Sequence, residues 1–345
     1  MSGSAPSVDP PIIDRYDAAL FDLDGVVYLG PDAVPGAADG LARLRERGAK
    51  LGFVTNNAAR PPSAVAKHLR ELGIATEDTD VVTSAQAGAR LLLDRFGAGA
   101  RVLVVGGEGI VAALGEFGLV GVHSADDAPV AVMQGYAVDL NWNHLIEAAI
   151  AIQHGAHWLA TNTDSTRPTD RGIVPGNGAA VDAVRTAVDV DPEVAGKPFR
   201  PLIDETITRL NAQNSIFVGD RLDTDIAGAI VVGLDSLFVL SGAHGARELL
   251  AAAPDSRPTH LGQDLNALLE AARSVVVESQ AVRCGATTVV DADGSLTFKA
   301  APTNRSQALD GLWAAAHLSW RAADEGRPLD PTPVLTALAG LNSPR

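Results

Sequence analysis

The sequence predicts an α/β protein with a doubly wound parallel sheet, into which a second α/β unit is inserted. Apolar segments of strand length alternate with segments of helical periodicity, and the strands read as continuous apolar runs, as in sheets buried on both faces. Several of these strands end in polar residues, at the edge where parallel sheets bind ligands. Because polar strand ends occur on both sides of a long central segment, an insertion fits better than two domains in tandem.

The composition is that of a folded globular protein and excludes some classes of partner. The 345 residues are 46% hydrophobic and 20% charged, with a net charge of −15. This acidic balance argues against nucleic-acid binding. Cys284 is the only cysteine, and no run approaches the ~20 apolar residues of a membrane span. We therefore expect no nucleic-acid or membrane partner and a cytoplasmic location.

The first strand, residues 18–21, is followed by the stretch around which the chain is organised. Asp22 and Asp24 lie at the end of this strand, where alternation can direct both side chains to one side. Gly25 then allows a tight turn. Two carboxylates this close repel each other, so the site should hold a cation, a shared proton or both. The alternative is an ordinary Asp-Gly turn without chemistry.

The remaining elements follow in an order that divides the chain into a core, a cap and an extension. We expect a catalytic core over 12–84 and 196–272, an inserted α/β cap over 85–195, and a small α+β extension over 273–345. Strands are expected at 49–54, 101–105, 130–133, 157–161, 215–218 and 237–240, and residues 81–83 close the first segment of the core. Helices are expected at 36–47, 61–73, 109–117, 143–153, 178–188, 202–210, 224–232, 261–272 and 306–322, and a hairpin with an Asp-Gly turn at 289–298.

Four polar clusters at predicted element ends suit phosphoryl transfer. Each cluster alone is commonly a turn, a helix cap or a surface lysine, and only their joint occurrence in this order favours a site. The clusters are Asp22 with Asp24, Thr55 with Asn56, Lys197, and Asp220 with Asp225.

Each residue type has a role in such chemistry. Asp22 can attack phosphorus to form an aspartyl-phosphate, and Asp24 can protonate the leaving alcohol and later deprotonate water. Hard carboxylate oxygens favour Mg²⁺ over zinc, with Asp220 completing the site and Asp225 acting directly or through a second layer. Lys197 can balance the phosphoryl charge, and Thr55 and Asn56 can donate hydrogen bonds to it.

Four segments together resemble the motifs of the haloacid dehalogenase superfamily of phosphatases. They are FDLDGVV, FVTNN, GKP and GDRLDTD, within roughly residues 16–270. The position of the cap between the second and third motifs, with ATNTD (160–164) and PGNGA (175–179), resembles the NagD and p-nitrophenylphosphatase subclass with a C2-type cap. The resemblance implies a Rossmann-like core, Asp22 as nucleophile and Asp24 as acid/base. It also implies Mg²⁺ held by Asp22, the Asp24 carbonyl and Asp220, with Asp225 supporting, and phosphate held by Thr55, Asn56 and Lys197.

The resemblance also bears on substrate and assembly. It implies a phosphatase for small phosphorylated metabolites, with glycerol 3-phosphate as the first choice and a place in glycerophospholipid metabolism. Phosphoglycolate, nucleotides and pyridoxal phosphate stay open as substrates, and the cap of relatives implies a homodimer. We expect the cap loop 161–172 to face the core, with Asp164 and Arg167 contacting the leaving group and setting substrate preference.

Three other functions compete with this prediction. Gly107, Gly109 and Ala112 fit the dinucleotide pattern G-x-G-x-x-A after a strand, which indicates an NAD-dependent oxidoreductase. A phosphate-ligand sensor that has lost turnover is a second alternative, and a phosphomutase is a third, although phosphomutases of this superfamily usually carry a helical cap after the first motif. The NAD alternative leaves the core carboxylates unexplained.

Overall fold

The computed structural model of the chain describes residues 9–169 and 171–339. Its largest sheet has six parallel strands in the order β15-β14-β13-β1-β4-β5. These strands are β1 (Ala18–Asp22), β4 (Lys50–Thr55), β5 (Val81–Thr83), β13 (Ser215–Gly219), β14 (Asp235–Val239) and β15 (His260–Gly262). From β1 the chain builds first one side of the sheet and then the other, so the topological switch point lies at the carboxyl end of β1.

Helices cover both faces of this sheet, which confirms the predicted doubly wound α/β class. Along β1, Ala19 and Phe21 belong to one apolar core and Ala18 and Leu20 to another, as the alternation of a strand requires. The first core includes α1 (Ala37–Glu46) and α2 (Pro62–Glu71), and the second includes α3 (Ser84–Phe96), α7 (Arg200–Leu210) and part of α8 (Ala227–Val232).

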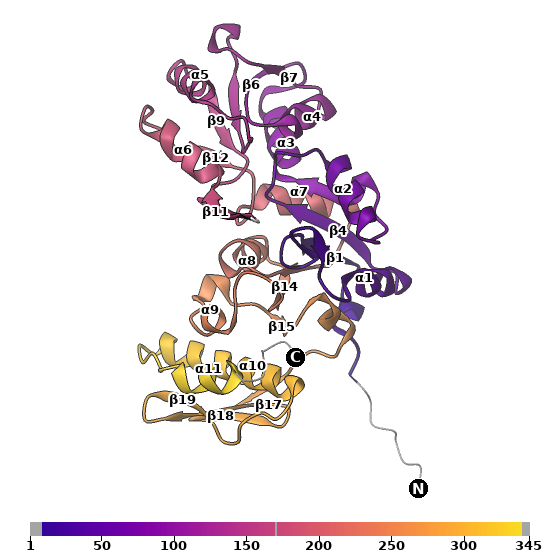
Figure 1. Cartoon of the computed structure of the whole chain (residues 1–345), viewed down its shortest axis with the longest axis vertical. Helices are drawn as coiled ribbons and strands as arrows, with labels where there is room; N and C mark the ends of the chain where they lie inside the picture. The colour runs from indigo at the N-terminus through magenta and orange to yellow at the C-terminus, as the bar shows by residue number, and fades with distance from the viewer. Residues whose placement is uncertain (1–8, 170, 340–345) are drawn as a thin grey trace.

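The segment between β5 and α7 forms a second α/β layer, which lies above the first sheet in Figure 1. Its five parallel strands have the order β12-β9-β8-β6-β7. They are β6 (Arg101–Val105), β7 (Val120–Val122), β8 (Ala131–Gln134), β9 (His157–Ala160) and β12 (Glu193–Val194), with helices α4 (Glu108–Glu116), α5 (Trp142–Gln153) and α6 (Asn177–Arg185). A hairpin, β10 (Thr166–Thr169) and β11 (Gly172–Pro175), follows β9.

The last part of the chain is an antiparallel sheet with two helices. Its strands, in the order β16-β17-β18-β19, are β16 (Val275–Val277), β17 (Ala281–Cys284), β18 (Thr287–Ala292) and β19 (Ser295–Phe298). The predicted hairpin is confirmed, since Ala292 pairs with Ser295 across Asp293 and Gly294, both at positive φ. Helices α10 (Arg305–Asp324) and α11 (Thr332–Ala339) complete it.

This extension packs onto the core through α9 (Ala246–Leu250), which lies next to α10 in Figure 1. One apolar cluster joins Leu249 and Leu250 of α9 to Trp313 and Trp320 of α10. The indole of Trp320 donates to the Leu249 carbonyl at 2.9 Å, and the Ser319 hydroxyl donates to the Leu250 carbonyl at 2.9 Å. Side chains of α10 therefore cap the carboxyl end of α9.

Two predicted elements are wrong in detail. The closing helix predicted at 261–272 is the edge strand β15 followed by a 3₁₀ turn at Leu265–Leu269, begun by the Asp264 side chain. Leu261 and Leu265 have helical spacing, but pairing of Leu261 with Phe238 of β14 prevails over it. The helix predicted at 224–232 begins with a π-helical turn at Leu222–Ile226. The boundaries proposed for core, cap and extension remain predictions.

Candidate active site

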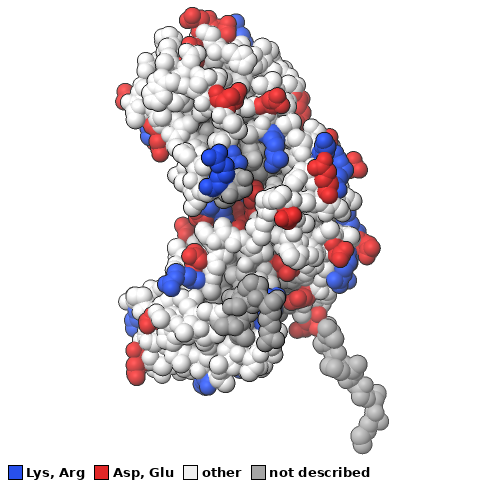
Figure 2. All heavy atoms as spheres, viewed as in Figure 1, with Lys and Arg blue, Asp and Glu red and all other residues white. Residues whose placement is uncertain are grey.

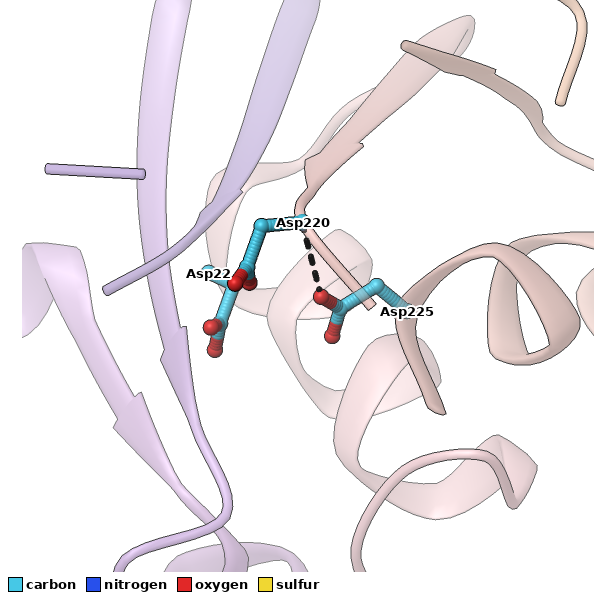
Figure 3. A group of neighbouring side chains, drawn as sticks. All are labelled: Asp22, Asp220 and Asp225. Atoms are coloured by element: carbon cyan, nitrogen blue, oxygen red, sulfur yellow. Dashed lines mark hydrogen bonds between the residues drawn. The ribbon is translucent and has the colours of Figure 1, made fainter. Parts of the chain in front are cut away.

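The carboxyl ends of the central strands bring three carboxylates together. Asp22 is the last residue of β1, Asp220 directly follows β13, and Asp225 lies in the π-helical turn that comes next. Figure 3 shows the three side chains converging from these separate segments, and one oxygen of each lies within 4.8 Å of the others. Residues almost 200 positions apart thus form one cluster at the topological switch point.

Lys197 lies among these carboxylates. Its Nζ is 2.5 Å from an oxygen of Asp22 and 2.7 Å from an oxygen of Asp225, and its side chain is 3% exposed. Burial alone would lower the pKa of Lys197, but Asp22 and Asp225 outweigh it and raise the pKa. The lysine is therefore a fixed positive charge in the cluster.

One lysine does not balance three carboxylates, of which Asp220 and Asp225 are buried and Asp22 is partly buried. Burial raises the pKa of Asp22 well above its usual range, Lys197 opposes this rise, and Asp225 and Asp220 add to it. Burial, followed by Asp225, raises the pKa of Asp220 to about 7. An oxygen of Asp220 is buried and has no hydrogen-bond partner within residues 9–169 and 171–339. A hard divalent cation would relieve both the charge excess and this orphaned oxygen, so the residues fit Mg²⁺.

The loop after β14 fixes the orientation of Asp220, a role that the sequence did not predict. The Ala243 N–H donates to the Asp220 carboxylate at 2.5 Å, and the Ser241 hydroxyl donates to the Gly25 carbonyl at 2.7 Å. Gly25, at φ +87°, and Gly242 press against the Asp220 side chain so closely that a Cβ at either would overlap it. The signal in the sequence was the stretch SGAHG, which follows an apolar strand as the other motifs do.

Asp24 occupies a different environment from Asp22. Its side chain is accessible from the cleft, but the surrounding protein excludes enough water to raise its pKa, and Arg60, Lys197 and Arg167 oppose that rise. A carboxyl with a raised pKa holds its proton more readily, which suits a general acid. Asp24 is thus exposed, whereas Asp22, two residues earlier, is partly buried and paired with Lys197. The contribution of Arg60 was not anticipated from the sequence.

Thr55 is the last residue of β4, which lies beside β1, and Asn56 directly follows it. Thr55 is buried, and its hydroxyl accepts from the Asn57 N–H at 3.1 Å. The Asn56 side chain bonds to the backbone of Lys197, with Oδ1 accepting from the Lys197 N–H at 2.8 Å and Nδ2 donating to its carbonyl at 3.1 Å. The phosphate-binding roles predicted for both residues stay predictions.

The cap contributes Asp164 and Arg167 to the side that faces the core. Asp164 accepts a hydrogen bond from Asn56 Nδ2 at 3.3 Å, and burial raises its pKa. The guanidinium of Arg167, in β10, lies 4.6 Å from the ring centre of Tyr136, and its charge opposes the rise in the pKa of Asp24. Figure 2 shows the surface hollowed between cap and core, with basic side chains at the rim and acidic ones inside. The role of Asp164 and Arg167 in choosing the leaving group stays a prediction.

The glycine-rich turn of the cap packs against the core. The Gly109 N–H donates to the Ala59 carbonyl at 3.3 Å. A Cβ at Gly109 would overlap the Ala58 carbonyl and lie 2.8 Å from the Arg60 carbonyl, both in the loop after β4. The glycines thus allow a close approach of two backbones, and the core loop lies where a pyrophosphate would have to bind. The dinucleotide interpretation of this motif is therefore not supported.

A carboxylate cluster with one buried lysine, at the switch point of a doubly wound core beneath an α/β cap, defines a phosphoryl-transfer hydrolase. Comparison with known sequences gives the same class. The family description "Haloacid dehalogenase-like hydrolase" matches residues 19–120, and a related HAD-hydrolase-like description matches residues 194–268. The chain belongs to the haloacid dehalogenase-like hydrolases and is a phosphoric monoester hydrolase.

Named relatives are phosphatases. A D-glycerol 3-phosphate phosphatase of Mycobacterium tuberculosis is 46% identical over 269 residues, which cover 78% of this chain and 75% of that protein. An acid sugar phosphatase of Staphylococcus haemolyticus is 35% identical over 254 residues, which cover 73% of this chain and 95% of that protein.

Solved structures that resemble this chain are also phosphatases. A glycerol phosphate phosphatase from M. tuberculosis in complex with magnesium has a TM-score of 0.84 at 39% identity and covers 96% of this chain and 99% of its own. A p-nitrophenyl phosphatase from Archaeoglobus fulgidus has a TM-score of 0.69 at 25% identity and covers 74% of this chain and 98% of its own. In the described part of the chain, every helix is too short or too polar to cross a bilayer.

Proposed function

We propose that this phosphatase hydrolyses glycerol 3-phosphate to glycerol and inorganic phosphate. The observation that carries the chemistry is the convergence of Asp22, Lys197, Asp220 and Asp225 beneath the cap. The observation that favours this substrate is the similarity to a D-glycerol 3-phosphate phosphatase, which extends over 78% of the chain. Phosphoglycolate, nucleotides and pyridoxal phosphate are the competing substrates.

In this proposal the reaction has two steps at Asp22. A carboxylate oxygen of Asp22 forms a bond to phosphorus while the bond from phosphorus to the glycerol oxygen breaks, and Asp24 gives its proton to that oxygen. Asp24 then takes a proton from water as the water oxygen attacks phosphorus. The bond from phosphorus to Asp22 breaks, which releases inorganic phosphate and restores both carboxyl groups.

The other site residues orient the phosphoryl group and compensate its charge. The Asp22 and Asp220 carboxylates and the Asp24 carbonyl, with Asp225 in support, would hold Mg²⁺, which would supply positive charge against the phosphoryl oxygens. Lys197 supplies a second positive charge, and the Thr55 hydroxyl and the amide at Asn56 donate hydrogen bonds. The cap excludes water, and Asp164 and Arg167 contact the leaving group.

Phosphate release across a panel of phosphorylated metabolites, with and without Mg²⁺, tests the proposal. Glycerol 3-phosphate should give the highest kcat/KM, and Asp22→Asn should lower it by at least ~10³-fold, since the nucleophile is lost. Asp39→Asn, which neutralises an exposed carboxylate on α1, is the matched control and should retain activity. Full activity of Asp22→Asn would rule out the covalent route. A preference for phosphoglycolate would change the substrate, and phosphate binding without release would favour the sensor.

Two further predictions concern the setting of the enzyme. A cytoplasmic location and a homodimer formed through the cap follow from the sequence and its resemblance. Light scattering of the purified full chain distinguishes a dimer from a monomer of 35.6 kDa. A monomer at all concentrations would refute the dimer without affecting the proposed chemistry.

A further inference from the structure

Asn56 makes an unusual set of contacts for a residue next to a strand end. Its side-chain oxygen accepts from the Lys197 N–H at 2.8 Å and its nitrogen donates to the Lys197 carbonyl at 3.1 Å. One amide side chain thus pairs with both backbone polar groups of a residue 141 positions away, as a neighbouring strand would. This pairing fixes where the Lys197 side chain starts, and therefore where its ammonium can reach.

The approach of Asn56 to the lysine loop depends on Gly196. A Cβ at residue 196 would lie 2.7 Å from Asn56 Oδ1 and 2.5 Å from the Thr161 carbonyl of the cap. Both distances are shorter than side chains tolerate. Core, cap and lysine loop therefore meet at one point, with no space for a side chain at residue 196.

The same asparagine also binds the cap. Its Nδ2 donates to Asp164 at 3.3 Å, and its backbone carbonyl accepts from Asn162 Nδ2 at 2.8 Å. Asn162 is itself held by Asn177 of α6, whose Nδ2 donates to the Asn162 carbonyl at 2.7 Å. Two residues of the cap loop and the backbone of Lys197 thus share one partner in the core.

We infer that Asn56 is a positioning residue that makes the placement of the Lys197 ammonium depend on the docking of the cap through Asp164. Asn56 needs both hydrogens of its amide for this, because one bonds to the lysine carbonyl and the other to the cap carboxylate. A cap that moves away removes one of these bonds and loosens the other. This inference rests on the proposed role of Lys197 at the phosphoryl group, and it assigns the Asn56 side chain a task separate from phosphate binding.

Exchange of this amide for a carboxylate tests the inference. Asn56→Asp keeps the acceptor for the Lys197 N–H but places an acceptor opposite the Lys197 carbonyl and Asp164, so both donated bonds become repulsive. Asn57→Asp is the matched control, because the Asn57 side chain accepts from the Ala59 N–H at 2.9 Å and a carboxylate can do the same. Asn56→Ala serves as a neutral second variant if the carboxylate prevents folding.

We expect Asn56→Asp to lower kcat by at least ~100-fold on glycerol 3-phosphate and on p-nitrophenyl phosphate alike, because Lys197 acts on the phosphoryl group common to both. Inhibition by orthovanadate, which occupies the phosphoryl site, should weaken by ~10-fold or more. Asn57→Asp should stay within about threefold of the parent in both. A structural defect alone would reduce the amount of active enzyme and leave the vanadate inhibition constant unchanged.

A double-mutant cycle tests the link to the cap. In an Asp164→Ala background the repulsion between residues 56 and 164 is gone, so Asn56→Asp should cost ~10-fold less than in the parent. Equal losses in both backgrounds would show that the cap is not coupled to Lys197, and an unchanged vanadate constant would show that Asn56 does not position it. A parent chain inactive on every phosphate ester would instead overturn the proposed function.

Discussion

Removal of the buried lysine should destabilise the cation-free protein far more than removal of an exposed one. Lys197 forms ion pairs of 2.5 and 2.7 Å with side chains that are 13% and 1% exposed. Breaking a buried pair by removing one partner costs about 3–5 kcal/mol, because it leaves an uncompensated charge. Lys197→Met should therefore lower the free energy of unfolding by about 3–5 kcal/mol in EDTA.

Lys67→Met is the matched control for this experiment. Lys67 pairs with Glu71 on α2 at 3.8 Å, with side chains that are 74% and 60% exposed. Such i,i+4 pairs contribute about 0.3–0.5 kcal/mol. Urea unfolding of the parent and both variants in EDTA, followed by circular dichroism, gives the comparison directly.

Mg²⁺ should restore part of the stability that Lys197→Met loses. A ligand at 100 times its Kd stabilises a protein by about 2.7 kcal/mol, and the cation binds more tightly where the lysine no longer competes for the carboxylates. Mg²⁺ should thus stabilise Lys197→Met more than the parent. Equal stability of Lys197→Met and Lys67→Met in EDTA would contradict this prediction, and so would an equal stabilisation of the parent and Lys197→Met by Mg²⁺.

Three further changes probe other parts of the molecule. Gly109→Ala should lower the free energy of unfolding by about 1–3 kcal/mol and raise KM, because its Cβ would press on the core loop. Gly115, on the same helix, has open space around it, so Gly115→Ala should raise the free energy of unfolding by about 0.5–1 kcal/mol. Urea unfolding measures both changes. Gly242→Ala should displace Asp220 and weaken Mg²⁺ binding at least ~10-fold by titration calorimetry, with Gly245→Ala, whose nearest contact is 3.6 Å away, as the silent control. Burial, followed by Arg257, lowers the pKa of His317, so the unfolded state binds the proton more readily and stability should fall as the pH drops below about 6.5. His317→Phe should flatten this decline in thermal melts between pH 7 and 5, and an unchanged slope would contradict it.

The sequence predicted three of the four core motifs well because each lies at the end of an apolar strand, namely β1, β4 and β13. Asp22 is the last residue of β1 and Asp220 follows β13, and parallel strands necessarily bring their carboxyl ends to one edge. The continuous apolar run at residues 18–21 also predicted burial on both faces, which the two apolar cores confirm. The order of motifs was thus sufficient to predict which segments meet.

The features that the sequence did not reveal depend on tertiary contacts. The strand β15 is three residues long, too short for its period to compete with the helical spacing of the leucines around it. The pairing of Asn56 with the Lys197 backbone, and of Ala243 with Asp220, joins loops whose spacing in the chain carries no periodic signal. Gly107 and Gly109 matched the dinucleotide pattern, because a close approach of two backbones requires glycine just as a bound phosphate does.

The contact between α10 and α9 bears on attempts to shorten the enzyme. A chain that stopped at residue 272 would expose Leu249 and Leu250 to water and leave their carbonyls without the Ser319 and Trp320 donors. The segment that leads into α9 also holds Asp220. A minimal phosphatase made by trimming would therefore need a redesigned polar surface at α9, and a search for soluble fragments should begin there.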